Sequence, residues 1–326
     1  MAATECSSLD CDPEASGRKA RVYVWDLDES LIIFNSLLNH QFALANPSCP
    51  KPEASALGEQ WQDAILDFID DFFFYRQVED VNIAHVSELD KFPDSDDDSP
   101  LDLDASSSSG PFTEICKDVA LRMRAAVSLY GQGLETMDIS LKRSADLCDL
   151  YEKTDQMANG WLSHARKTLL ELQRLSTRLR EEEDTETHMM LVTTGELLPT
   201  LAKLMLFRLE EFFRPDDIYS AKGPGKLWCF KHIQQRFEGT AVRYICIGDG
   251  PEEEAAAASL TWPFLRIALD TTGCATIGQK EDTKVHRANG YLLSCKANDS
   301  FGSKGRCLTM LSAQELHALT LASDRT

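Results

Sequence analysis

The stretch Arg21–Leu38, RVYVWDLDESLIIFNSLL, decides the fold. Within it, Val22–Trp25 is a short apolar run typical of a strand buried on both faces of a parallel sheet. Asp26 and Asp28 follow directly, at the end of the strand where open α/β sheets have their sites. In an extended backbone, residues i and i+2 point the same way, so the two carboxylates can share one cation or one phosphorus atom. Taken alone, the pattern is equally typical of an acidic surface turn.

Further apolar runs alternate with helical segments in the second half of the chain. We expect strands at 188–192, 218–219, 241–247 and 264–268, with helices at 197–213, after the turn 221–226 as far as 236, and from about 251. This alternation predicts a parallel sheet with helices on both faces. Between the first two strands the chain is helical instead, with helices expected at 60–75, 112–130, 140–157 and 162–183. The predicted fold class is therefore α/β, with a large helical insertion after the first strand.

These patterns predict a division of the chain into four parts. The core comprises residues 20–38 and 186–270, and the helical insertion comprises 39–185. Residues 1–19 are small and acidic, and we expect them to be disordered. Within the insertion, 87–110 is acidic and rich in serine, so we expect a disordered loop. The tail, 271–326, lacks clear periodicity apart from a short helix at 312–321, and we assign it no function.

Composition restricts the partners of the protein. The 326 residues have a formal net charge of -20 and a pI of about 4.7, which argues against nucleic acid or an anionic membrane as a partner. A phosphate site in such a chain needs local positive charge from a metal or a lysine. The 10 cysteines form no CxxC pair and no zinc spacing. We find no secretory signal and no apolar run of spanning length, so we expect an intracellular protein of the cytoplasm or the nucleus.

Four polar features occur in order along the chain, each after a predicted strand or at the start of a helix. They are Asp26–Asp28, Thr193–Thr194, Lys226, and Gly248–Gly250 followed by Glu252–Glu254. Each has an ordinary explanation on its own: a strand end, a solvated lysine, a turn, or acidic residues at a helix N-terminus. Their joint order is the evidence for a site, because together they supply what phosphoryl transfer needs.

Phosphoryl transfer by a carboxylate nucleophile proceeds through an acyl phosphate. A second acid protonates the leaving oxygen and then deprotonates water. Repulsion between nucleophile and phosphate has to be offset by a cation and a divalent ion. Mg²⁺ prefers a few carboxylates, waters and a substrate oxygen. We expect Asp26, Asp249 and the main-chain carbonyl of Asp28 to supply these ligands.

The remaining polar residues would bind the phosphate and support the metal. Thr194 offers a hydroxyl and a backbone N–H to phosphate oxygens. Lys226 offers a positive charge, although Lys222 in the same turn is an alternative. Glu253 lies one helical turn past Asp249 and can hold the waters of the metal. The two glycines around Asp249 allow close approach of the backbone.

Six strings of the sequence resemble the haloacid dehalogenase superfamily and, more closely, the Eyes absent family of protein tyrosine phosphatases. The strings are RVYVWDLDESLIIFNSLL, WLSHARKTLLEL, LVTTGELLPTLAKLMLF, IYSAKGPGKLWCFKHIQQRF, YICIGDGPEEEAA and WPFLRI, within residues 20–269. The resemblance implies a Rossmann-like haloacid dehalogenase core whose helical cap is the insertion 39–185. It also implies a Mg²⁺-dependent, aspartate-based phosphatase that hydrolyses phosphotyrosine in proteins, with further protein partners binding through the cap.

The resemblance also implies a role for individual residues. Asp26 matches the nucleophile and Asp28 the general acid and base. Thr194 and Lys226 match phosphate-binding positions. The metal ligands would be Asp26, Asp28 and Asp249, with Glu253 as an accessory acidic residue.

The sequence departs from the family in three respects, and two alternative functions have to be considered. Ser30 stands where the family usually has threonine, and Gly195–Glu196 replaces Thr-Gln. The long activation region of animal members is absent, so the chain resembles the plant members and a coactivator role is not implied.

A small-metabolite phosphatase is one alternative function, because a closing cap seals small substrates whereas an open cap admits a protein loop. The other is a non-catalytic interaction module that uses the cap surface.

Overall fold

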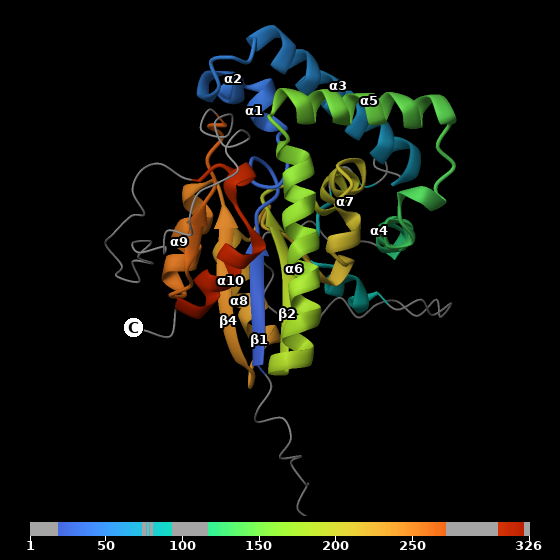
Figure 1. Cartoon of the computed structure of the whole chain (residues 1–326). Helices are drawn as coiled ribbons and strands as arrows, with labels where there is room; N and C mark the ends of the chain where they lie inside the picture. The colour runs from blue at the N-terminus through green and yellow to red at the C-terminus, as the bar shows by residue number, and fades with distance from the viewer. Residues whose placement is uncertain are drawn as a thin grey trace, which may run out of the picture.

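A five-stranded parallel sheet forms the centre of the protein (Figure 1). The computed structural model describes residues 19–73, 76, 78, 81–92, 117–271 and 306–322. The strand order is β3–β2–β1–β4–β5. The strands are β1 (Lys19–Trp25), β2 (Thr185–Thr193), β3 (Ile218–Ser220), β4 (Ala241–Gly248) and β5 (Phe264–Arg266). Trp25 of β1 is in register with Leu191 and Ile247, so the carboxyl ends of the three central strands share one edge.

Helices cover both faces of this sheet, as predicted. Val22 and Val24 belong to one core with α8 (Lys226–Arg236) and α9 (Pro251–Ser259). Tyr23 and Trp25 point to the opposite face, where the core includes α6 (Trp161–Glu183) and α10 (Ala313–Ala322). The two sets alternate along β1 because successive side chains of a strand face opposite ways.

The insertion between β1 and β2 is helical. Its helices are α1 (Asn35–Leu38), α2 (Gln41–Ala45), α3 (Lys51–Phe72), α4 (Lys117–Gln132), α5 (Leu141–Met157) and α6, with short 3-10 turns η3 (Val86–Lys91) and η4 (Leu134–Thr136). In Figure 1, α1, α2, α3 and α5 lie beyond the carboxyl end of β1, whereas α6 runs back along the sheet and contacts β2. Trp61 of α3 stacks on Phe207 at 4.0 Å between ring centroids, so the aromatic stripe of α3 packs in the core.

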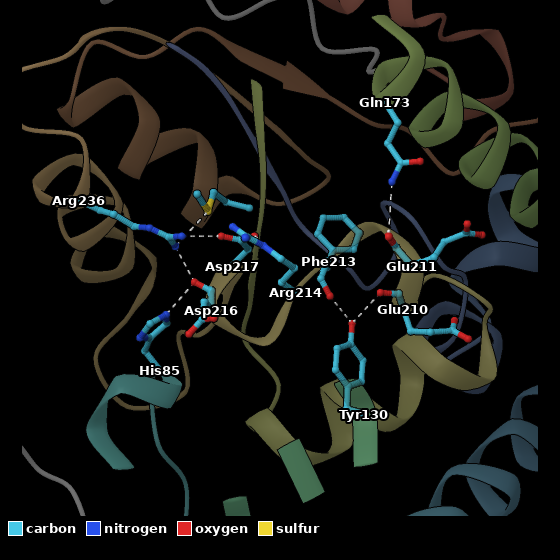
Figure 2. A network of polar contacts seen from close by, with 11 residues as sticks. His85, Tyr130, Gln173, Glu210, Glu211, Phe213, Arg214, Asp216, Asp217 and Arg236 are labelled. Carbon is cyan, nitrogen blue, oxygen red and sulfur yellow. Dashed lines mark hydrogen bonds and ion pairs between the residues drawn. The ribbon is translucent and has the colours of Figure 1, made fainter. Parts of the chain in front are cut away.

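A polar network links the insertion to the segment between α7 (Leu197–Leu206) and β3 (Figure 2). Tyr130 of α4 donates its hydroxyl hydrogen to the carbonyl of Phe213, at 2.7 Å. From the core side, Arg236 of α8 pairs with Asp217 at 2.9 Å. Figure 2 shows both contacts converging on this one segment, which also contains η5 (Glu210–Phe212) and η6 (Pro215–Asp217). The segment is thereby fixed from both sides.

Several expectations differ from the structure, among them the start of α3 at Lys51 rather than at residue 60 and the end of β5 at Arg266 rather than at residue 268. The helix expected at 197–213 ends at Leu206, because Arg208 adopts a left-handed backbone with φ of 59°. The loop expected at 87–110 begins instead with η3, in which Val86 and Leu89 are buried. The sequence did not indicate this turn, because the two apolar residues stand next to a stretch that is mainly acidic. Lys19, which was expected to be disordered, is the first residue of β1 and pairs with Thr185 of β2.

The remainder of the two stretches that were expected to be disordered, 1–18 and 93–110, lies outside the described residues. In the tail, the expected helix is confirmed as α10, and 272–305 lie outside the described residues. Where the insertion ends and the core begins stays a prediction. Throughout the described part of the chain, no helix combines the length and hydrophobicity that a bilayer span requires.

Candidate active site

Asp26 follows the carboxyl end of β1, and each of its two carboxylate oxygens accepts a hydrogen bond. Its backbone N–H donates to the carbonyl of Ile247, which ties it to β4. Oδ1 accepts a hydrogen bond from Nζ of Lys226 at 2.6 Å, and Oδ2 accepts one from the hydroxyl of Ser30 at 3.2 Å. The side chain is buried. A buried carboxylate with fixed oxygens has one orientation available, which is what attack on a bound group requires.

Lys226 supplies the positive charge of the site. It opens α8, and its ammonium lies 2.6 Å from Asp26 and 3.0 Å from Oε2 of Glu253. Its side chain is buried, unlike that of Lys222, which is 56% exposed and pairs with Glu196. Of the two lysines considered from the sequence, the structure places Lys226 at the aspartate.

Asp249 and Glu253 complete a compact acidic cluster with Asp26. One carboxylate oxygen from each of the three lies within 4.8 Å of the others, and this is the only such group found among the described residues. Oε1 of Glu253 accepts a hydrogen bond from the N–H of Gly250 at 2.8 Å. A Cβ atom at Gly248 would lie 2.7 Å from this oxygen. Glycine therefore makes room at both positions, because a larger residue would crowd the side chain of Glu253. The sequence alone did not indicate this reason for the two glycines.

Burial and crowding change the pKa values of the groups in this cluster. Burial raises the pKa of Asp26 to about 8, although Lys226 opposes the change. Burial also raises the pKa of Asp249 to about 6, and the Glu253 carboxylate adds to the rise. Burial on its own would lower the pKa of Lys226, but Asp26 and Glu253 raise it above its usual value. When all three carboxyl groups are ionised, their charge exceeds that of the one ammonium, and a set of oxygen donors of this kind fits a hard divalent cation such as Mg²⁺.

Asp28 does not join this cluster through its carboxylate. Both of its oxygens accept hydrogen bonds from Nζ of Lys203, at 2.7 and 2.9 Å. Asp26 and Asp28 are therefore paired with different lysines, and the expectation that their carboxylates share one cation or one phosphorus atom stays a prediction. The main-chain carbonyl of Asp28 as a metal ligand stays a prediction. Sequence reasoning missed Lys203, whose signal was a lysine inside the apolar run LLPTLAKLML.

Thr194 lies on the same edge of the sheet, directly after the end of β2. Its side chain is exposed, and the neighbouring hydroxyl of Thr193 accepts a hydrogen bond from the N–H of Gly195 at 3.1 Å. The carbonyl of Gly195 in turn accepts a hydrogen bond from the hydroxyl of Ser220. The loop that presents Thr194 is thus fixed, while its phosphate-binding role stays a prediction.

Comparisons with known proteins identify the family of this chain. A scan against protein-family models finds no match. The chain is 40% identical over 255 residues to "Protein phosphatase EYA" of Arabidopsis thaliana, a match covering 76% of this chain and 82% of that protein. It is 31% identical over 282 residues to "Protein phosphatase EYA2" of Homo sapiens and 29% identical over 282 residues to "Protein phosphatase eya" of Drosophila melanogaster, where the matches cover 49% and 34% of those proteins. With its parallel sheet of the haloacid dehalogenase type and a relative this similar over most of both chains, the protein belongs to the Eyes absent family.

Proposed function

We propose that the protein is a Mg²⁺-dependent protein tyrosine phosphatase that works through an aspartyl phosphate. The observation that carries this proposal is the placement of Asp26, whose carboxylate lies between Lys226 and Ser30 and beside the other two acids of the cluster. The relatives support the same conclusion, because each is named a protein phosphatase. The preference for phosphotyrosine rests on the family resemblance.

In the first step, a carboxylate oxygen of Asp26 attacks phosphorus and the tyrosine phenolate departs. Asp28 gives this phenolate a proton. In the second step, Asp28 takes a proton from water, the resulting hydroxide attacks the phosphorus of the acyl phosphate, and the Asp26 carboxylate is regenerated as phosphate leaves. Lys226 offsets the negative charge that gathers between nucleophile and phosphate. Thr194 donates hydrogen bonds to the phosphate oxygens.

Mg²⁺ would bind to Asp26, to Asp249 and to the main-chain carbonyl of Asp28. When bound, the ion supplies positive charge against both the phosphate and the nucleophile. Glu253 is already engaged with Lys226 and Gly250, so its role is to fix the geometry of the cluster and to hold waters of the metal.

The substrate is proposed to be a phosphotyrosyl protein, and other protein partners would bind through the helical insertion. A phenol has a pKa of about 10, so its anion leaves more easily than the alkoxide of a sugar phosphate. We expect this difference, together with access for a protein loop, to separate the proposed activity from that of a small-metabolite phosphatase.

The test compares a phosphotyrosyl peptide, a set of sugar phosphates and an aryl phosphate as substrates of the wild-type chain and Asp26→Asn, with Mg²⁺ and with EDTA. We expect the peptide to be turned over fastest, EDTA to abolish turnover, and Asp26→Asn to lose about 10⁴-fold in kcat. Asp146→Asn, on the exposed side of α5, is the matched control and keeps full activity.

Each alternative has its own outcome in this experiment. Faster turnover of a sugar phosphate than of the peptide favours a metabolite phosphatase. Absence of turnover with every substrate favours an interaction module. Equal rates for the wild type and Asp26→Asn remove the assigned nucleophile.

A further inference from the structure

Lys203 is a buried lysine on a helix that gives no structural reason for one. Nine of the ten residues of α7 are buried, and Lys203 itself is only 9% exposed. Withdrawing an ammonium from water is unfavourable, and an apolar side chain of similar volume is often as good or better for stability. A methionine or leucine would therefore suffice for packing, so the charge calls for another explanation.

The contacts of Lys203 point to Asp28. Its ammonium donates to both carboxylate oxygens of Asp28, at 2.7 and 2.9 Å, and both side chains are largely buried. The ring of Phe34 lies 4.7 Å from the same nitrogen. Phe34 is held in turn, because its N–H donates to Oε1 of Glu29 at 3.1 Å. The ammonium is thus enclosed by the loop that follows β1, and its position is defined from two directions.

The two aspartates that follow β1 are paired with two different lysines. Asp26 and Asp28 are two residues apart, yet each is paired with a different lysine, Lys226 of α8 and Lys203 of α7. The first pair belongs to the cluster with Asp249 and Glu253, and the carboxylate of Asp28 does not. A cation bound by that cluster would attract any free carboxylate nearby, so something has to hold Asp28 apart.

We propose that Lys203 is a positioning residue that keeps the Asp28 carboxylate out of the metal cluster and aimed for proton transfer. This inference rests on the proposed phosphatase function. Without Lys203, the Asp28 side chain is free to turn toward the cation, where it no longer protonates the departing phenolate. The ammonium of Lys203 contacts Asp28 and Phe34, whereas Asp26 is paired with Lys226 and Ser30, so Lys203 acts on the reaction through Asp28.

The test uses two aryl phosphates that differ in their need for an acid. Phenyl phosphate has a basic leaving group and requires protonation, whereas the anion of 2,4-dinitrophenyl phosphate departs without it. We expect Lys203→Met to lower kcat for phenyl phosphate by about 10–100-fold, the size of effect that follows a misplacement near 1 Å, and to change KM little. For the dinitrophenyl ester the loss is much smaller.

A double-mutant comparison isolates the pathway through Asp28. Adding Lys203→Met to Asp28→Asn should leave the remaining rate unchanged, because Asp28 is no longer there to be positioned. Lys203→Arg keeps the charge and restores part of the phenyl phosphate rate. A purely structural lysine would instead lower both esters by one factor, in both backgrounds, and that result overturns the inference.

The outcomes also separate this inference from the function on which it rests. An inactive wild-type chain, or one unaffected by Asp26→Asn, overturns the proposed function and the inference together. An active, Asp26-dependent chain in which Lys203→Met keeps the wild-type ratio of the two rates overturns the inference alone. If Lys203→Met does not fold, Lys203→Arg gives the same comparison: a loss confined to phenyl phosphate supports the role of Lys203, and an equal loss for both esters contradicts it.

Discussion

Glu253 connects the acidic cluster of Asp26, Asp249 and Glu253 to the lysine of the site. One of its oxygens accepts a hydrogen bond from Gly250 and the other pairs with Lys226, so this side chain links α9 to the first residue of α8. Such a side chain needs space beside the backbone, and Gly248 provides it. The cluster therefore depends on a residue that has no functional group.

Gly248→Ala tests this dependence. The new Cβ would lie 2.7 Å from Oε1 and 2.8 Å from Cγ of Glu253, closer than real Cβ atoms approach other groups. Glu253 has to move, and Lys226 and the cation ligands move with it. We expect a loss of about 10–100-fold in Mg²⁺ affinity or in activity, the range seen when groups supporting metal ligands are changed. Steady-state rates measured over a Mg²⁺ titration give both quantities.

Gly131→Ala is the matched control. Gly131 lies on α4, and no atom is found within 4 Å of a Cβ built there. We expect unchanged activity and a gain in stability of about 0.5–1 kcal/mol, because alanine restricts the unfolded chain. Activity lost equally in both variants would contradict the role given to Gly248.

At the scale of elements, α10 packs in the core, together with the preceding residues Cys307, Leu308 and Leu311 of the described part of the tail. Leu316 is fully buried in the core between α10 and α6. Next to it, Nδ1 of His317 lies 2.8 Å from the guanidinium of Arg21, which also pairs with Glu183 at the end of α6. The helix thus covers one face of the sheet although little in the sequence of the tail predicted a role for it.

Leu316→Ala measures how much α10 contributes. Truncating a fully buried leucine leaves a cavity, so we expect the free energy of unfolding to fall by about 2–5 kcal/mol. Leu141→Ala is the control, since Leu141 is 91% exposed, and surface substitutions usually change stability by less than about 0.5 kcal/mol. Equal midpoints of urea unfolding for the two variants would show that α10 does not pack as described.

Element boundaries show where sequence reasoning succeeds and fails. The strands of the core follow from apolar runs bounded by turn residues, and all of them are found. Helix α7 ends earlier than predicted through a Schellman motif, in which the N–H of Leu209 bonds to the carbonyl of Leu204 at 2.7 Å. The left-handed residue of this motif is usually glycine, but here it is Arg208, so the sequence contained no signal for the end of the helix.

At the scale of the whole molecule, the parallel sheet brings distant residues together. Asp26 and Lys226 are 200 residues apart in the chain and 2.6 Å apart in space. Their convergence was predictable, because the carboxyl ends of parallel strands meet at one edge. The sequence did not predict which lysine pairs with which aspartate, because the pairing of Asp28 with Lys203 depends on how α7 packs.

The net charge of -20 affects how the whole molecule meets an anionic substrate. Long-range repulsion slows the encounter and is screened by salt, with a screening length near 8 Å at physiological ionic strength. We therefore expect kcat/KM for a phosphotyrosyl peptide to rise by about two- to tenfold as NaCl increases from low to physiological concentration at fixed free Mg²⁺, with kcat nearly constant. A fall in kcat/KM over this range would indicate attraction instead.

The formation of an aspartyl phosphate at Asp26 is the central claim, and trapping it is the most direct measurement. The protein is mixed with a phosphotyrosyl peptide and Mg²⁺, quenched in acid within milliseconds, digested and analysed by mass spectrometry. We predict a phosphoryl group on the peptide that contains Asp26, removed by hydroxylamine as an acyl phosphate should be, and missing in Asp26→Asn. Turnover with no phosphoryl group on that peptide, or with the group on another residue in both proteins, would contradict the account.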